Sequence, residues 1–163
     1  MSSLPKEEIH QAVLDALAGQ VESHGPLEDA PFALKPRGVL PLAIWAYTVT
    51  SPPGGRHPLE SKIQLIAPGQ GRNERGHLEP PDEESFSILL GYKPDDELFV
   101  LWDAYKHVAF AFSKNVQVRA KALQDALTFG TGEMTRTLRT GEERIIAARA
   151  DHLLQALKMR IAS

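Results

Sequence analysis

The 163-residue sequence contains no cysteine. This absence excludes a disulfide framework, a thiolate-ligated zinc site and a cysteine nucleophile, and it fits a reducing compartment. No apolar run approaches the roughly 20 residues that a membrane-spanning helix requires. The chain opens on charged Lys6, Glu7 and Glu8 instead of the apolar stretch of a secretory signal. We therefore expect a cytoplasmic protein with no membrane partner.

Several sequence motifs of catalysis are also missing. No glycine-rich run ends in Lys-Ser or Lys-Thr, and neither G-x-S-x-G nor H-E-x-x-H occurs, so phosphate-loop nucleotide hydrolysis and the nucleophile-elbow serine hydrolases are excluded. The six histidines show no metal-ligand spacing, although Asp103 and His107 would meet if that turn were helical. The sequence therefore predicts no metal site and no cofactor.

The composition, 42% hydrophobic and 24% charged, is typical of a globular chain of one domain's length. We expect a first helix after Ser3 that ends near Gly19, an extended connection over 19–38, and strands over 39–49, 59–67, 85–92 and 98–103. One or two short strands follow over 110–118, then a helix over 119–129 with Leu127 inward and a stop at Gly130, a short strand over 144–149, and a last helix capped by Asp151.

This order of elements predicts an α+β fold. The expected architecture is a β-rich central sheet or pseudobarrel flanked by an N-terminal helix and two C-terminal helices, with residues 1–163 in a single domain. Trp45 and Trp102 lie among aliphatic residues of expected strands, which favours positions in the core. Asp103 is expected to end its strand and to bond loop amides.

Charge is unevenly distributed despite a net charge of −3. Residues 104–124 contain no Asp or Glu, whereas Lys106, Lys114 and Arg119 fall in that stretch. The segments 56–57 and 72–75 add further basic residues, and the acids collect elsewhere. Such segregation indicates a face of positive potential, whose commonest partner is phosphate. The alternative is that these charges only solvate the surface.

Glu60-Ser61-Lys62 on an expected strand matches half of a nuclease motif. That chemistry needs a second carboxylate so that two acids hold a divalent metal while the lysine orients or activates water. The preceding strand, 39–50, contains no acid. Glu60 and Lys62 are therefore interpreted as a surface or DNA-contacting pair, with catalysis as the alternative.

The segment 113–119, Ser-Lys-Asn-Val-Gln-Val-Arg, gathers several groups that contact nucleic acids. Asn115 and Gln117 carry amides that can bond adenine bidentately, Lys114 and Arg119 can bond guanine, and the Ser113 hydroxyl can hold phosphate. The alternative is a polar turn that caps the following helix.

The runs 54–65, 88–92, 99–103 and 113–118 together resemble the N-terminal DNA-recognition domains of bacterial restriction endonucleases. The resemblance implies a β-pseudobarrel whose two arms grip the major groove, here Arg56–Gln64 and Ser113–Arg119. It also implies a nuclease domain on the same polypeptide. The first helix and the helical last third depart from a minimal pseudobarrel.

The leading hypothesis is a sequence- or modification-specific double-stranded DNA-binding domain of a restriction-modification system, without catalysis of its own and with methylated DNA as one candidate ligand. The alternatives are a small metal-dependent endonuclease that uses Glu60 and Lys62, and a protein-interaction module. The predicted DNA-contacting residues are Arg56, His57, Lys62, Gln64, Arg72, Arg75, Lys106, Ser113, Lys114, Asn115, Gln117 and Arg119.

Overall fold

The computed structural model describes residues 4–50, 60–66, 76–78, 82–107, 109–110, 113–139 and 141–163. For some of these residues only the backbone pairing is described, namely 60, 64–66, 76–77, 109–110 and 113–115. None of the helices in these ranges is long and apolar enough to cross a membrane.

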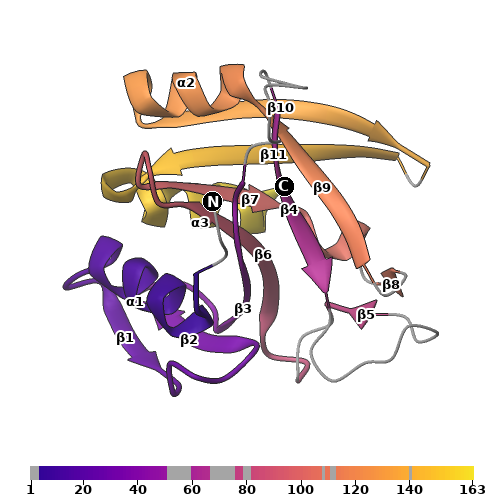
Figure 1. The fold of residues 1–163 in the computed structure, drawn as a ribbon. Helices are drawn as coiled ribbons and strands as arrows, with labels where there is room; N and C mark the ends of the chain where they lie inside the picture. The colour runs from indigo at the N-terminus through magenta and orange to yellow at the C-terminus, as the bar shows by residue number, and fades with distance from the viewer. Residues whose placement is uncertain are drawn as a thin grey trace.

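Three α-helices and eleven strands make up the described part of the chain (Figure 1). The helices are α1 (Lys6–Ala16), α2 (Ala120–Phe129) and α3 (Leu153–Ala162), with short 3-10 turns η2 (Ala104–Lys106) and η3 (Ala150–His152). The strands are β1 (Val21–His24), β2 (Phe32–Pro36), β3 (Leu42–Thr48), β4 (Glu60–Ile66), β5 (Gly76–His77), β6 (Phe86–Lys93), β7 (Leu98–Trp102), β8 (Ala109–Phe110), β9 (Ser113–Arg119), β10 (Thr131–Leu138) and β11 (Gly141–Arg149).

Seven strands form one mixed sheet in the order β1-β2-β3-β6-β7-β11-β10. Neighbouring strands run antiparallel except β3 and β6, which pair in parallel from Leu42 opposite Phe86 to Thr48 opposite Tyr92. A parallel pair needs a long crossover, and the chain between these strands contains β4 and β5. Those two strands pair outside the large sheet, β4 with β9 and β5 with β8.

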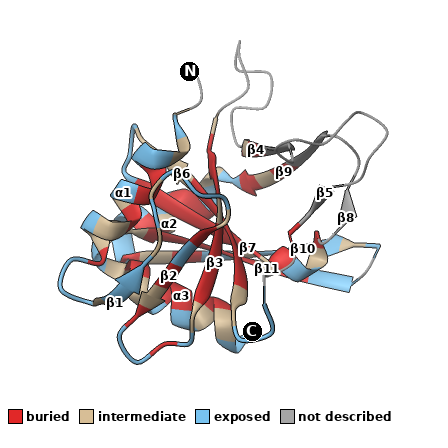
Figure 2. Ribbon diagram, turned by 90° about the horizontal axis from the view of Figure 1, so that it is seen from below, coloured by how far each residue is buried: buried red, intermediate tan, exposed pale blue. Residues whose placement is uncertain are grey.

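Each face of the large sheet has its own apolar core. On one face Ile9 and Val13 of α1 pack with Leu153 and Leu157 of α3 and with alternate sheet residues. On the other face Leu123 of α2 belongs to the same cluster as residues of β4 and β9. The central strands β3, β6, β7 and β11 are the most buried (Figure 2), as expected for strands covered on both faces. The predicted α+β fold, a β-rich central sheet flanked by an N-terminal helix and two C-terminal helices, is confirmed.

Several predicted elements are confirmed. Strand β4 and the β6–β7 hairpin lie where the sequence indicates them. Helix α2 ends at Gly130, whose φ of 97° suits glycine. Trp102 is fully buried, and Asp103 ends β7 with its carboxylate accepting from the Tyr105 main-chain N–H at 3.0 Å.

Other predictions were wrong or incomplete. Residues 19–38 are more than a connection, because they contain β1 and β2, in which Phe32 and Leu34 alternate with more exposed residues. The last strand begins at Gly141 and pairs along its length with β10, which the sequence analysis did not predict. Leu127 is 43% exposed, since the inward stripe of α2 is narrower than predicted. Asp151 does not cap α3; its carboxylate binds Arg149 instead.

Candidate nucleic-acid interface

The two segments predicted as separate DNA-binding arms are hydrogen-bonded partners in one two-stranded ribbon. Strands β4 and β9 pair antiparallel along seven residues each, from Glu60 opposite Arg119 to Ile66 opposite Ser113. We call this pair the β4–β9 ribbon (Figure 1). Polar and apolar residues alternate over 62–65 of β4 and over 115–118 of β9, and the register aligns the two patterns. The ribbon therefore has one apolar and one polar face.

The apolar face packs onto the large sheet. Ile63, Val116 and Val118 are between 0 and 4% exposed and belong to the core around Trp102. Gly91 of β6 makes this approach possible, because a Cβ there would lie 2.6 Å from Val49 Cγ2, 2.8 Å from Trp102 Cζ3 and 3.0 Å from Ile63 Cγ2. Such distances are shorter than van der Waals contact. The ribbon is thus seated directly on the β6 backbone.

The opposite face presents polar side chains. Lys62 and Gln117 are Cα partners across the ribbon; both are half-buried, and Arg119 at the end of the row is exposed. The positions of Gln64, Asn115 and Ser113 continue this row in the backbone register, whereas Lys114 pairs with Leu65 in the other row. A two-stranded ribbon of this kind has dimensions that fit the major groove of B-DNA.

Both the main chain and the side chain of Gln117 accept hydrogen bonds. Its main-chain oxygen accepts from the Trp102 indole N–H at 2.9 Å. Its Oε1 accepts from Nη1 of Arg136, on β10, at 3.1 Å. Arg136 is a member of this surface that the sequence analysis missed. The threonines at 131, 135 and 137, with arginine at 136 and 139, were the available signal, because threonine at a spacing of two favours a strand.

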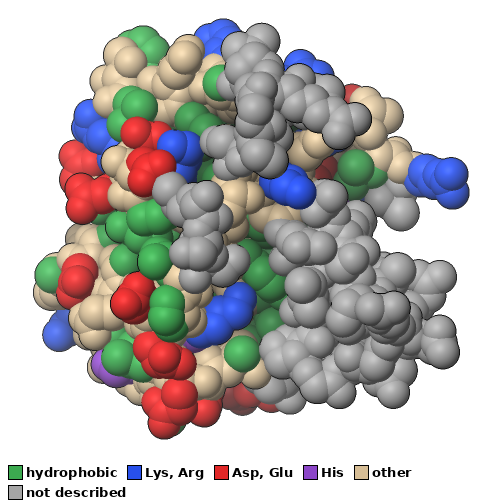
Figure 3. Space-filling view, viewed as in Figure 1, with side chains coloured by type: hydrophobic (Ala, Val, Ile, Leu, Met, Phe, Trp, Pro, Cys, Tyr) green, Lys and Arg blue, Asp and Glu red, His purple; other side chains and the backbone are tan. Residues whose placement is uncertain are grey.

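The β10–β11 hairpin carries further positive charge. Arg139 is exposed at its end, and Lys and Arg side chains are visible at the protruding tip in Figure 3. Lys106 of η2 approaches the same hairpin, since its Nζ lies 3.4 Å from where a Cβ on Gly141 would stand. Asp and Glu side chains lie mostly on the other side of this view, the side that carries α1. The predicted segregation of charge is thus partial in the described residues, because Glu133 and Glu142 of the same hairpin are exposed as well.

Four of the predicted DNA-contacting residues cannot be placed on this surface because they lie outside the described residues. They are Arg56, His57, Arg72 and Arg75. Glu60 has Arg119 as its backbone partner in the ribbon. Across the described ranges, no group of three or more His, Asp or Glu side chains could hold a metal ion.

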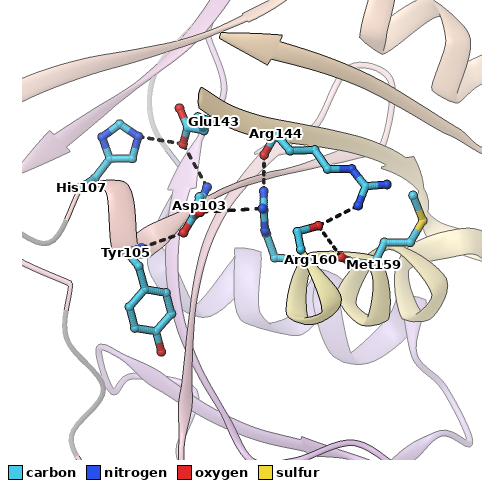
Figure 4. A network of polar contacts seen from close by, with 8 residues as sticks. Asp103, Tyr105, His107, Glu143, Arg144, Met159 and Arg160 are labelled. Carbon is cyan, nitrogen blue, oxygen red and sulfur yellow. Dashed lines mark hydrogen bonds and ion pairs between the residues drawn. The ribbon is translucent and has the colours of Figure 1, made fainter. Parts of the chain in front are cut away.

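A buried polar network involves the residues on either side of η2, Asp103 and His107 (Figure 4). Nε2 of His107 lies 2.8 Å from Oε2 of Glu143, and the same oxygen accepts from the Asp103 main-chain N–H at 3.0 Å. His107 and Glu143 are 2% and 1% exposed. Arg160 of α3 donates to the Arg144 carbonyl nearby, and its burial lowers the pKa of the guanidinium from its ordinary value. His107 therefore meets Glu143 on β11, and the predicted contact with Asp103 is indirect.

A half-buried charge, on Lys6, anchors the first helix. The Lys6 ammonium lies 3.7 Å from the ring centroid of Tyr47 and donates to the Ala46 carbonyl. Desolvation lowers the pKa of Lys6 to about 8 and raises that of Tyr47 to about 12. This pair joins α1 to β3 and lies apart from the ribbon.

Comparison with known proteins gives a match to a protein family. A protein-family model described as "Methylase-associated X1" matches residues 41–157, which span β3 to α3 and include both strands of the ribbon. No curated protein and no solved structure matches the chain.

Proposed function

The chain belongs to the methylase-associated X1 family, and we propose that it is a sequence- or modification-specific double-stranded DNA-binding module. The description of the family ties it to methylases, which suggests a restriction-modification context. We further propose that the chain is the DNA-recognition part of a restriction enzyme. A nuclease domain on the same polypeptide would then be the partner that cuts the DNA.

The observation that carries this proposal is the register of the β4–β9 ribbon. It puts Lys62, Gln117 and Arg119 on one polar row, although the two strands are far apart in the sequence. A lysine or arginine binds phosphate at any sequence, whereas an amide reads the edge of a base. The cations Lys62 and Arg119 are thus the candidates for affinity, and the amide of Gln117, on the same surface, is the candidate for specificity.

The neighbouring elements support the same function. The apolar face of the ribbon is packed against a rigid sheet, so its polar side chains are carried on a fixed platform. Arg136 and Arg139 extend the positive surface from the ribbon onto β10. On this proposal the ribbon enters the major groove and the hairpin contacts the DNA backbone.

A fluorescence-anisotropy titration of the full chain tests the proposal. Methylated and unmethylated duplexes are titrated over a series of salt concentrations, with and without magnesium. We expect log affinity to fall linearly with log salt, with a slope of about −0.9 per phosphate contact. Lys62→Ala should weaken binding and shallow the slope by about 1. Lys158→Ala is the matched control, because Lys158 is an exposed cation on α3, on the far face of the sheet.

Two outcomes would overturn the proposal. Absence of duplex binding at low salt, or binding that does not change with salt, would remove its electrostatic basis. Magnesium-dependent cleavage by the wild type, lost in Glu60→Ala, would instead favour the endonuclease alternative.

A further inference from the structure

Gln117 and Arg136 form a polar pair whose chemistry is more restricted than that of either side chain alone. Nη1 of Arg136 donates to Oε1 of Gln117 at 3.1 Å, across 19 residues of sequence. A guanidinium has only donors, so the amide atom that faces it must be the oxygen. The contact therefore fixes which way the amide points. The NH₂ group of Gln117 is left as the part of the amide directed away from Arg136.

The surroundings keep this orientation in place. The Trp102 indole holds the main-chain oxygen of Gln117, and Lys62 is its Cα partner on β4. Opposite Arg136 on β11, Glu143 is 1% exposed, and its Oε2 is engaged by His107 and by the Asp103 amide. The amide thus lies between two cations, and the carboxylate opposite Arg136 is buried. The acid on the same row of the ribbon, Glu60, has Arg119 as its backbone partner.

We propose that Gln117 and Arg136 together read a guanine in the major groove. The inference rests on the proposed function and names the base that the ribbon would recognise. A guanine edge offers two acceptors, N7 and O6, whereas an adenine edge offers the N7 acceptor and an N6 donor. A free glutamine matches adenine because it supplies one donor and one acceptor. With its oxygen turned toward Arg136, Gln117 presents the donors of its NH₂ group to a base, and the remaining guanidinium N–H groups add more. The pair therefore matches guanine and disfavours adenine, which changes the adenine preference expected for Gln117 alone.

Base analogues in the DNA test the guanine contact and leave the fold of the protein unchanged. A preferred site is first selected from a random duplex pool with the full chain. Each guanine of that site is then replaced in turn by 7-deazaguanine, which lacks the N7 acceptor. We expect one guanine at which this replacement weakens binding roughly 5- to 150-fold, the range of a good bidentate contact. Inosine at the same position is the control, because it lacks only the minor-groove amino group and should bind almost as well.

Variants of the protein test the pairing itself. Arg136→Ala frees Oε1 of Gln117, so the preference at that position should move from guanine toward adenine. Gln117→Glu places an acceptor where a donor is needed and should abolish the guanine preference. Arg139→Ala, at the exposed tip of the same hairpin, is the control and should weaken binding equally at all sequences. Circular dichroism of each variant confirms that it is folded.

The two proposals fail in different ways. Sequence-specific binding in which no guanine responds to loss of N7 would overturn this inference and leave the DNA-binding function standing. The same holds if the preferred base at the sensitive position is unchanged in both Arg136→Ala and Gln117→Glu. Absence of duplex binding by the wild type would overturn both.

Discussion

The indole N–H of Trp102 donates to the main-chain oxygen of Gln117 at 2.9 Å. Trp102 is fully buried in the large sheet, whereas Gln117 lies on the polar row of the β4–β9 ribbon. A core residue is therefore bonded directly to the backbone of the strand that carries the candidate base-reading amide. This contact couples the stability of the sheet to the position of the ribbon.

Replacing Trp102 by Phe should weaken that coupling. The variant loses one hydrogen bond, about 1 kcal/mol, in addition to the cost of the smaller ring in a filled core. Urea denaturation measures the stability. If duplex binding is present in the wild type, the preferred site should lose more affinity than random DNA. An equal loss of affinity for the preferred site and for random DNA would show that the indole hydrogen bond does not position Gln117.

Gly91→Ala should destabilise the protein by about 1–3 kcal/mol. The added Cβ would press on Val49, Trp102 and Ile63 at 2.6 to 3.0 Å, and overpacking of this kind forces backbone shifts. Thermal unfolding measures the effect, with Leu40→Ala as a control at an exposed apolar site. An unchanged melting temperature would mean that the ribbon can lift from the sheet at no cost.

Glu143→Ala should be among the most damaging substitutions in the described part of the chain. It removes the acceptor of both His107 and the Asp103 amide in a buried site, and breaking a buried pair costs about 3–5 kcal/mol. Glu133→Ala is the matched control, since Glu133 forms an exposed ion pair with Arg144 on the same hairpin and should cost about 1 kcal/mol or less. Chemical denaturation distinguishes the two; similar losses would contradict a structural role for Glu143.

The pKa of about 8 for Lys6 predicts an unusual alkaline pH dependence. Between pH 8 and about 10 the folded protein releases the Lys6 proton, whereas the unfolded chain retains it. The unfolded state then binds more protons, so the free energy of unfolding should rise with pH in this window. Above pH 10 the raised pKa of Tyr47 acts in the opposite direction.

Lys6→Met serves as the control for this pH dependence, because it keeps much of the side chain and removes the titrating group. Urea denaturation of both proteins at pH 7.5 and 9.5 gives the comparison. The wild type should gain stability relative to the variant at the higher pH. A constant difference between the two would contradict the desolvated state of Lys6.

The sequence predicted the elements whose patterns are local. β4 alternates from Lys62 to Leu65, and the β6–β7 hairpin has a turn of charged and proline residues between apolar runs, so both were found. β9 was expected only within one or two short strands over 110–118. β1 and β2 were missed because the proline and glycine content of residues 19–38 obscures a short alternation at Phe32 and Leu34. Asp151 was predicted as a cap from position alone, but two neighbours, His152 and Arg149, bind its carboxylate and lower its pKa.

The candidate site depended on pairing that no local pattern encodes. The sequence placed Lys62 and Gln117 on two strands, but it could not show that these strands are partners, because the parallel crossover between β3 and β6 determines where β4 lies. Arg136 was missed with the whole of β10. Its contact with Gln117 changes the chemistry of the amide, which a residue-by-residue interpretation of the segment 113–119 could not anticipate.

The two strands of the ribbon come from different connections, β4 from the chain between β3 and β6 and β9 from the chain between β7 and α2. The seven strands of the large sheet pair with one another, and neither β4 nor β9 is among them. Substitutions on the polar row can therefore accumulate without disturbing the register of the sheet. Such a scaffold separates the candidate recognition surface from most of the sheet that maintains the fold. On the proposed function, a ribbon exchanged between homologues should carry its base preference only when β10, which supplies Arg136, is exchanged with it.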